Sequence, residues 1–305
     1  MKPTNIILGL IIAAILISGL IILSNQKIEE PTTLNKSEAG TDNIRTAISL
    51  CEKIPEKYKR DYCIAIVSNN SSVCDTMDNY VSRLLCNLFV AFVSGDSSIC
   101  DKMHDTDNKN YCIALAKRDY SVCDRIANKV VKNWCYERVA EVTKDTHACS
   151  MIRDNTIEEY CLRLVAKANK KPSICVGILT YDQRNYCIIE SSEDLGYCYK
   201  MPEQDWKNYC IARVSGDPSA CTKLVNQSWK DNCYWYVATE NKDPLTCEKL
   251  EDNDWRNYCI AIASDDPSFC GQILNNHQKG FCYFHIAKDI ANITFEAEIP
   301  FIVQL

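Results

Sequence analysis

The cysteines of this sequence fall into ten pairs with one constant spacing, because the members of every pair stand at positions i and i+12. From one pair to the next the spacing is i+11 or i+14, so the repeat period is i+23 or i+26. The pairs are Cys51 and Cys63, Cys74 and Cys86, Cys100 and Cys112, Cys123 and Cys135, Cys149 and Cys161, Cys175 and Cys187, Cys198 and Cys210, Cys221 and Cys233, Cys247 and Cys259, and Cys270 and Cys282. All 20 cysteines of the 305-residue chain belong to this pattern. It predicts an array of ten copies of one short unit.

Each unit opens with the signals of a helix N-terminus. Three residues after the first cysteine an apolar residue follows in every unit, on the face of the cysteine at helical spacing. Proline occupies or adjoins the first helical position at Pro172, Pro218, Pro244 and Pro267. An Asp or Asn, which accepts hydrogen bonds from the free amides of a first turn, stands four residues before the cysteine at Asn70, Asp96, Asp119, Asp145, Asp194, Asp217, Asp243 and Asp266. These signals predict a first helix of about two turns.

The second cysteine of a unit lies in a more apolar segment. Four residues after it an apolar residue recurs, with Ser191 as the departure. An aromatic residue usually precedes it, at Tyr62, Tyr111, Trp134, Tyr160, Tyr186, Tyr209, Tyr258 and Phe281, with Leu85 and Asn232 as the departures. This spacing predicts a second helix, so that each unit is an αα-hairpin. The aromatic row can serve as packing or as a platform for a carbohydrate.

The constant separation favours a disulfide within each hairpin. Cys221 and Cys233, for example, lie six residues either side of a turn near Asn226 and Gln227, so antiparallel helices bring them face to face. The alternative joins the second cysteine of one unit to the first of the next, but that separation varies and leaves Cys51 and Cys282 unpaired. A disulfide tolerates Cα separations of only about 4.4–6.8 Å, which suits the constant spacing better.

We therefore predict an all-α solenoid of ten disulfide-linked hairpins over residues 46–292. The longer units insert three residues, which is close to one helical turn, so we expect a longer second helix with the same buried face. A single hairpin of this size buries little apolar surface. We therefore expect stacking on its neighbours and the disulfide to stabilise it in place of a larger core. With helices about 8–10 Å apart, the stack would be a rod or superhelix on the order of 100 Å long.

The N-terminus predicts a membrane anchor. Residues 6–23 form an apolar run that, at about 1.5 Å per residue, nearly matches the thickness of a bilayer. Lys2 precedes the run, while Glu29 and Glu30 offset Lys27 after it, which favours an N-terminus inside and a body outside. Residues 1–5 are then a cytoplasmic tip and residues 24–45 a flexible tether. A cleaved signal peptide is the alternative, and either segment exports the cysteines to an oxidising compartment.

The C-terminal tail, residues 293–305, belongs to no repeat. Ile293, Phe295, Ala297 and Ile299 alternate with polar residues at the period of a strand. We expect it either to cap the open end of the solenoid or to add as a strand to a partner or a second copy.

No pattern in the sequence indicates chemistry at the thiols or elsewhere. There is no C-x-x-C, and His104, His147, His277 and His285 are scattered, so we expect no metal site and no cofactor. No G-x-S-x-G holds a nucleophile, so we expect no enzyme activity. The net charge of −6 gives no basic field for a nucleic-acid partner.

Two sets of surface residues are candidates for contact or modification. Sequons for N-glycosylation lie at Asn35, Asn69, Asn70, Asn226 and Asn292. A basic residue stands three residues before the second cysteine in nine units, with Glu158 as the exception, at Arg60, Arg83, Lys109, Lys132, Arg184, Lys207, Lys230, Arg256 and Lys279. This basic row could bind an acidic partner, or each residue could pair with a nearby carboxylate and orient the stack.

In architecture, residues 51–287 resemble the secreted cysteine-rich proteins built of Sel1-like repeats, in which a disulfide joins the two helices of each hairpin. Those repeats are longer and their paired cysteines closer, so the resemblance implies only a disulfide-linked α-solenoid. The twin-cysteine coiled-helix proteins of the mitochondrial intermembrane space are similar in principle, with shorter spacing. The anchored chain, rich in Ile, Lys and Asn, looks most like uncharacterised cysteine-repeat proteins of archaeal cell envelopes.

These observations together favour a non-catalytic module of the cell envelope, anchored by its N-terminal helix, that presents a rigid surface to a protein or glycan partner. One alternative is a subunit of a self-assembling surface fibre or layer. The other is a thiol-disulfide enzyme of the envelope or its accessory, which would need free thiols at rest.

Overall fold

The computed structural model describes residues 36–293, and the ten hairpins lie in the compact unit that starts at Asn43. The predicted tip (1–5), anchor (6–23) and tail from residue 294 onward lie outside the described residues. Residues 36–45, predicted as the end of the tether, are helical, because helix α2 begins at Lys36. Within the described range, no helix combines the length and the apolar character that crossing a membrane requires.

The described residues form helices and no strand, as predicted. We number the hairpins 1 to 10 in chain order. From hairpin 2 onward each has a short first helix and a longer second helix, whereas in hairpin 1 the first helix has 16 residues and the second has 11. The second helices are α3 (Lys57–Val67), α5 (Tyr80–Ser94), α6 (Thr106–Lys117), α7 (Lys129–Thr143), α9 (Asn155–Asn169), α10 (Tyr181–Ser191), α12 (Gln204–Ser215), α13 (Gln227–Asn241), α15 (Asn253–Ser264) and α16 (Asn276–Ile290).

From hairpin 2 onward the first helices begin where the sequence predicts and have four to six residues, which is one to two turns. Asp96, Asp119 and Asp145, like their counterparts in later hairpins, accept a hydrogen bond from the amide two residues on. After the two turns of η1 the backbone becomes extended at Met103, because the chain must reverse to form the second helix. The first helices are α2 (Lys36–Cys51), α4 (Ser72–Asp75), α8 (Thr146–Ser150), α11 (Leu195–Tyr199), α14 (Pro244–Cys247) and the 3₁₀ helices η1 (Ser97–Lys102), η2 (Tyr120–Arg125), η3 (Pro172–Gly177), η4 (Pro218–Lys223) and η5 (Phe269–Gln272).

The three inserted residues of the longer units lie in the second helix, as predicted. Second helices that precede the shorter gap between cysteine pairs have 11 or 12 residues. Those that precede the longer gap have 15 residues. The insertion therefore adds nearly one turn and keeps the buried face in register.

All ten disulfides join the two helices of one hairpin, which confirms the favoured pairing. Their Cα–Cα separations are 5.3–5.7 Å, and no cysteine is free. The cysteines are at most 1% exposed, so the bonds lie in the core.

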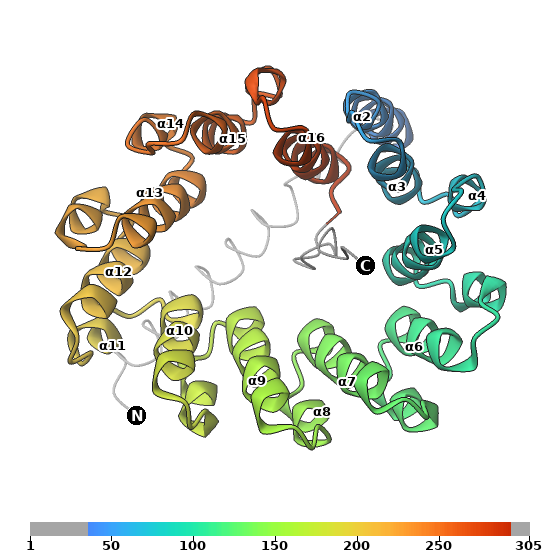
Figure 1. Cartoon of the computed structure of the whole chain (residues 1–305), viewed down its shortest axis with the longest axis horizontal. Coiled ribbons are helices and arrows are strands. Elements are labelled where there is room, and N and C mark those ends of the chain that lie inside the picture. Colours follow the sequence, from blue (N-terminus) through green and yellow to red (C-terminus); the bar gives the residue numbers. More distant parts are fainter. Residues whose placement is uncertain (1–35, 294–305) are drawn as a thin grey trace, which may run out of the picture. The chain divides into compact units, whose positions relative to one another are not determined.

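The unit that starts at Asn43 closes into a ring, which differs from the predicted rod or superhelix on the order of 100 Å long. Second helices form the inner wall and first helices the outer wall, and α16 of hairpin 10 packs against α3 of hairpin 1 (Figure 1). Tyr62 of α3 lies 6.1 Å from Phe284 of α16 between ring centroids. The small rotation between successive hairpins accumulates until the two end faces meet. The open end that the tail was predicted to cap is therefore covered by hairpin 1.

The hydrophobic core is continuous around most of the ring but changes at hairpin 6. One cluster of buried residues runs through hairpins 9, 10 and 1 to 5, and a second runs from hairpin 6 to hairpin 9. Between them lies a small cluster around Cys175, Ile178 and Cys187. Ser191, the one departure from the apolar pattern, is buried here and donates a hydrogen bond to the Cys187 carbonyl.

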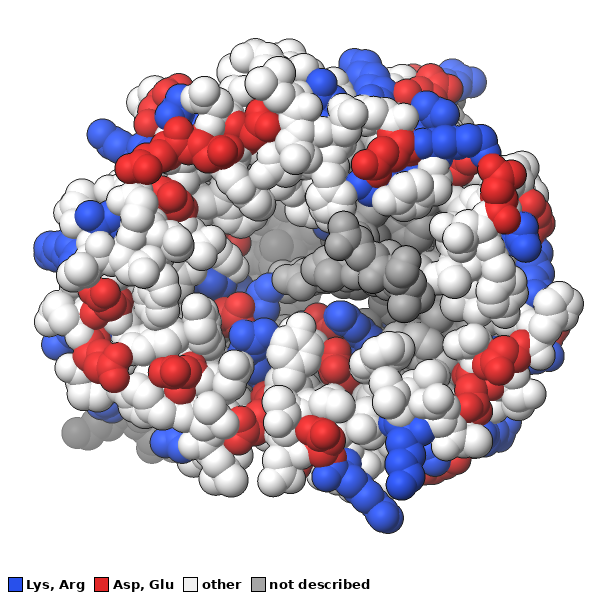
Figure 2. Space-filling view, viewed as in Figure 1, with Lys and Arg blue, Asp and Glu red and all other residues white. Residues whose placement is uncertain are grey.

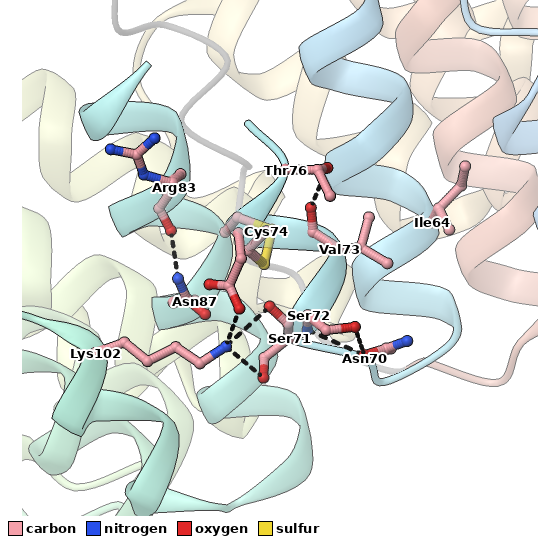
Figure 3. Close-up of a disulfide and its surroundings, with 12 residues drawn as sticks. Ile64, Asn70, Ser71, Ser72, Val73, Cys74, Thr76, Arg83, Asn87 and Lys102 are labelled. Atoms are coloured by element: carbon pink, nitrogen blue, oxygen red, sulfur yellow. Dashed lines mark hydrogen bonds and ion pairs between the residues drawn. A yellow bond between two sulfur atoms is a disulfide. The ribbon is translucent and has the colours of Figure 1, made fainter. Parts of the chain in front are cut away.

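Polar contacts fix the register between neighbouring hairpins. On the outer wall, Lys102 of η1 reaches back to hairpin 2, where its Nζ lies 2.7 Å from Asp75 and also donates to Ser71 (Figure 3). At the hairpin turns, the carboxylate of Asp254 accepts hydrogen bonds from the amides of Leu274 and Asn275 in the next hairpin. Asp107 binds hairpin 4 and Glu159 binds hairpin 6 in the same way. Each of these carboxylates accepts hydrogen bonds from backbone amides that the turn of the next hairpin leaves free.

Several second helices end in a left-handed residue that is not glycine. Arg118 has φ 53°, and the amides of Arg118 and Asp119 bind the carbonyls of the last turn. Glycine holds the same position at Gly95 and Gly216. Because a Cβ atom is strained in this conformation, we expect Arg118→Gly to raise the free energy of unfolding by about 0.5–1 kcal/mol in urea titrations.

The matched control is Lys117→Gly, one residue earlier, where the backbone is helical. It should lower the free energy of unfolding by up to about 1 kcal/mol. Equal effects of the two substitutions would contradict the assignment of strain to Arg118.

Candidate functional site: a charged and aromatic cluster on hairpins 4 to 8

We call the contact between the second helices of two neighbouring hairpins a seam. The seams of the inner wall follow one rule. The residue before the second cysteine of a hairpin lies beside the residue three positions after the second cysteine of the next hairpin. Tyr62 and Phe89 form such a pair, with ring centroids 5.7 Å apart, and so do Tyr258 and His285, at 5.8 Å. The second position of the pair is apolar in five hairpins, at Ile66, Phe89, Leu115, Leu164 and Ile262.

In the other five hairpins this seam position carries a polar group, at Arg138, Glu190, Arg213, Tyr236 and His285. Four of these five lie within hairpins 4 to 8, on α7, α10, α12 and α13. Apart from Leu164 of hairpin 5, the seam positions of this sector therefore carry ions or an aromatic ring rather than aliphatic side chains. We call these four residues, with Glu137, Glu141, Tyr160, Arg163 and Lys167 around them, the inner cluster.

Arg138 and two glutamates of α7 form the first part of the inner cluster. The Arg138 guanidinium lies 3.0 Å from Glu141 and 3.6 Å from Glu137. Burial raises the pKa of Glu137 to about 7, against the opposing attraction of Arg138. Burial alone would lower the pKa of Arg138, but Glu141 and Glu137 outweigh it and raise that pKa. Glu137 is thus a carboxyl that can exchange a proton near neutral pH.

Arginine and tyrosine side chains pair in the remainder of the inner cluster. The Arg163 guanidinium lies 4.8 Å from the ring centroid of Tyr160 and pairs with Glu190 at 3.6 Å. The Arg213 guanidinium lies 3.3 Å from the ring centroid of Tyr236 and hydrogen-bonds to the Tyr236 hydroxyl. Such contacts hold a guanidinium in place while its remaining N–H groups can donate to a ligand.

The side chains of distant hairpins converge in this sector. Burial raises the pKa of Tyr236, and Lys167 of hairpin 5 and Glu190 of hairpin 6 also act on it. Because hairpin 5 is three hairpins from hairpin 8 along the chain, these groups project from the inner wall toward one another. The cluster is therefore one surface rather than a set of isolated pairs.

A cluster of aromatic rings supports hairpins 6 to 8 beside the inner cluster. Trp206 lies 4.6 Å from Tyr186 and 4.4 Å from Trp229 between ring centroids, in edge-to-face geometry. Tyr209 lies 5.6 Å from Trp229. Two members of the predicted aromatic row, Tyr186 and Tyr209, thus pack against rings of neighbouring hairpins. Trp134 of the same row is exposed.

The structure places five of the nine residues of the predicted basic row against backbone carbonyls of their own hairpins. Arg83, Arg184 and Arg256 donate to the carbonyls of Met77, Ile178 and Leu250, the apolar residues that end the first helices. Arg60 donates to Ile54 in the same way, while Lys132 donates to the Asp124 carbonyl and Lys109 pairs with Asp101. Charges of both signs are interspersed over the face seen in Figure 2. A role of the row in binding an acidic partner stays a prediction.

The sequons lie at exposed helix ends. Asn69 and Asn292 are left-handed residues that follow second helices, and the side chains of Asn70 and Asn226 accept hydrogen bonds at the starts of helices. Asn35 lies outside the described residues. Glycosylation of these residues stays a prediction.

Among residues 36–293, no group of three or more His, Cys, Asp or Glu side chains is placed to hold a metal ion. Sequence reasoning missed the inner cluster, although its signal was present in the change from apolar to polar residues three positions after the second cysteine. Comparison of the chain with protein-family models, with curated proteins and with solved structures found no match. The resemblances to Sel1-like and archaeal envelope proteins therefore rest on architecture alone.

Proposed function

We propose that this chain is a non-catalytic binding module of the cell envelope, which uses the inner cluster to contact a protein or glycan partner. The observation that carries the proposal is a ring of ten hairpins, each closed by its own disulfide, that holds arginines against tyrosines on one sector of its inner wall. Disulfides persist in oxidising compartments, and a helical repeat with so many of them is typical of an extracellular module. We propose further that residues 6–23 anchor it to the membrane.

The chemistry of the inner cluster suits a polar partner. Arg163 and Arg213 are fixed over aromatic rings, and Glu190 supplies an acceptor beside them. Planar guanidinium groups bind carboxylates in two-point geometry, and aromatic rings stack on sugar or peptide faces. The alternative role as a thiol-disulfide enzyme would need a resting thiol, and all 20 cysteines are in disulfides.

The test is saturation binding of the fluorescently labelled chain to isolated cell envelopes of its source. We expect the double variant Arg163→Met and Arg213→Met to raise the Kd at least tenfold, because methionine keeps the packing on the rings and removes the donors. Periodate treatment of the envelopes abolishes binding to a glycan, while protease treatment abolishes binding to a protein.

The control variant is Lys207→Met with Lys230→Met, from the predicted basic row outside the inner cluster. It should bind like the wild type. Loss of binding in this control, with full binding by the arginine variant, would transfer the contact to the basic row. Polymers in place of saturable binding would favour the fibre or layer subunit instead.

A further inference from the structure

The seam between hairpins 10 and 1 differs from all others in its covalent connection. The chain runs directly from each hairpin to the next at nine seams, but at this one the two sides are the two ends of the repeat region. Every disulfide lies within one hairpin, so none crosses this seam. Only non-covalent contacts close the ring.

This seam also contains a buried cation. Lys59 of α3 is 1% exposed, while the corresponding position, four residues before the second cysteine, carries no ionisable side chain in the other hairpins. Gly280 of α16 lies against it, because a Cβ atom there would be in van der Waals contact, 3.6 Å from Lys59 and 3.4 Å from Ile54, and a longer side chain would meet both. At the position of Gly280, five other hairpins carry asparagine, at Asn110, Asn133, Asn185, Asn208 and Asn257. Lys59 of hairpin 1 and Gly280 of hairpin 10 thus lie together at this seam, and no other hairpin has lysine or glycine at the corresponding position.

His277 covers the buried cation from the solvent side. The Nδ1 atom of His277 lies 2.7 Å from Nζ of Lys59, so a neutral imidazole accepts a hydrogen bond from the ammonium. Glu56 forms an ion pair with Lys59, and the rings of Tyr58 and Phe281 lie 5.6 and 5.9 Å from Nζ. The charged groups that act on His277 are therefore Lys59 and Glu56, both from hairpin 1, and Phe281 packs on its ring from α16 itself.

We propose that the seam between hairpins 10 and 1 is a clasp at which the ring opens, and that protonation of His277 opens it. A protonated imidazole can no longer accept from Lys59, and it places a second positive charge beside a cation that is buried. Burial, followed by the charge of Lys59, lowers the pKa of His277, and the exposed imidazole is accessible to solvent protons. Acid therefore weakens this seam, whose two sides have no covalent connection to hold them together once it opens.

The experiment is hydrogen–deuterium exchange of the full oxidised chain at pH 7.5 and pH 5.5, corrected for intrinsic exchange rates. In the wild type we expect peptides of α3 to lose protection by up to about tenfold at pH 5.5, the limit for one histidine with an ordinary pKa near 6.5, with smaller losses in α6 and α7. In His277→Gln, which keeps an acceptor but does not titrate, α3 should show equal protection at both pH values, while α16 keeps the loss that His285 causes. Lys59→Met removes the buried charge and should also abolish the pH response of α3.

The control His104→Gln changes an exposed histidine far from the seam and should keep the wild-type response. His285→Gln tests the other histidine of α16, which faces hairpin 9 and should leave the response at pH 5.5 in place. A uniform loss of protection around the ring, no loss at all, or an undiminished response in His277→Gln would each overturn the clasp.

Discussion

Reduction of the disulfides is expected to unfold the ring under conditions in which the oxidised protein is stable. From hairpin 2 onward the first helices have only four to six residues, which do not hold a helix without support. In the chain-entropy model, closing a loop of this length contributes about 3 kcal/mol per disulfide. Even if these contributions add only in part, ten of them exceed the roughly 5–15 kcal/mol by which a native protein is stable. Far-UV circular dichroism with and without a phosphine reductant measures the loss of helix.

Removal of a single disulfide should show how much each hairpin depends on its own bond. Cys175→Ala with Cys187→Ala removes the bond of hairpin 6, where the core is smallest, and is expected to lower the stability more than Cys100→Ala with Cys112→Ala in hairpin 3. A reduced chain that keeps its helical signal and its melting temperature would contradict the stabilising role. An equal loss in both double variants would contradict the weakness of hairpin 6.

Acid is expected to destabilise the ring through His285. Burial, followed by the charge of Lys288, lowers the pKa of His285 from an ordinary value near 6.5 to about 4. The unfolded chain therefore takes up this proton first as the pH falls, and stability that is complete above pH 6.5 is lost between about pH 6.5 and pH 4. The shift corresponds to a loss of up to about 3 kcal/mol. Urea unfolding at pH 7.5 and pH 4.5 measures it.

The physical reason lies in the pair formed by His285 and Tyr258. The Tyr258 hydroxyl is 2.6 Å from Nδ1 of His285 and donates to the neutral ring, which a protonated ring cannot accept. The double variant Tyr258→Phe with His285→Leu restores the apolar seam of other hairpins without leaving a buried hydroxyl unpaired. It should lose less stability at pH 4.5 than the wild type, while His104→Leu should behave like the wild type. The same acid loss in all three proteins would rule out this pair as the cause.

The repeat structure could be predicted from sequence because its determinants are local. The constant spacing of the paired cysteines specifies an antiparallel hairpin, whose disulfides have Cα–Cα separations of 5.3–5.7 Å. Asp96 and its counterparts mark the helix starts through a hydrogen bond two residues away. The three-residue insertions lengthen the second helix because a helical turn has nearly that many residues. Each of these rules depends on one hairpin alone.

Closure of the ring and the inner cluster depend on how hairpins stack, which no single hairpin encodes. The rotation from one hairpin to the next arises from packing between them, and only its sum over ten seams decides between a rod and a ring. The sequence alone thus determined the hairpin, its disulfide and its helix lengths, because these follow from contacts a few residues apart. Tertiary structure alone brought Lys59 to His277, far away along the chain, and Lys167 toward Tyr236, because such neighbours exist only once the stack is complete.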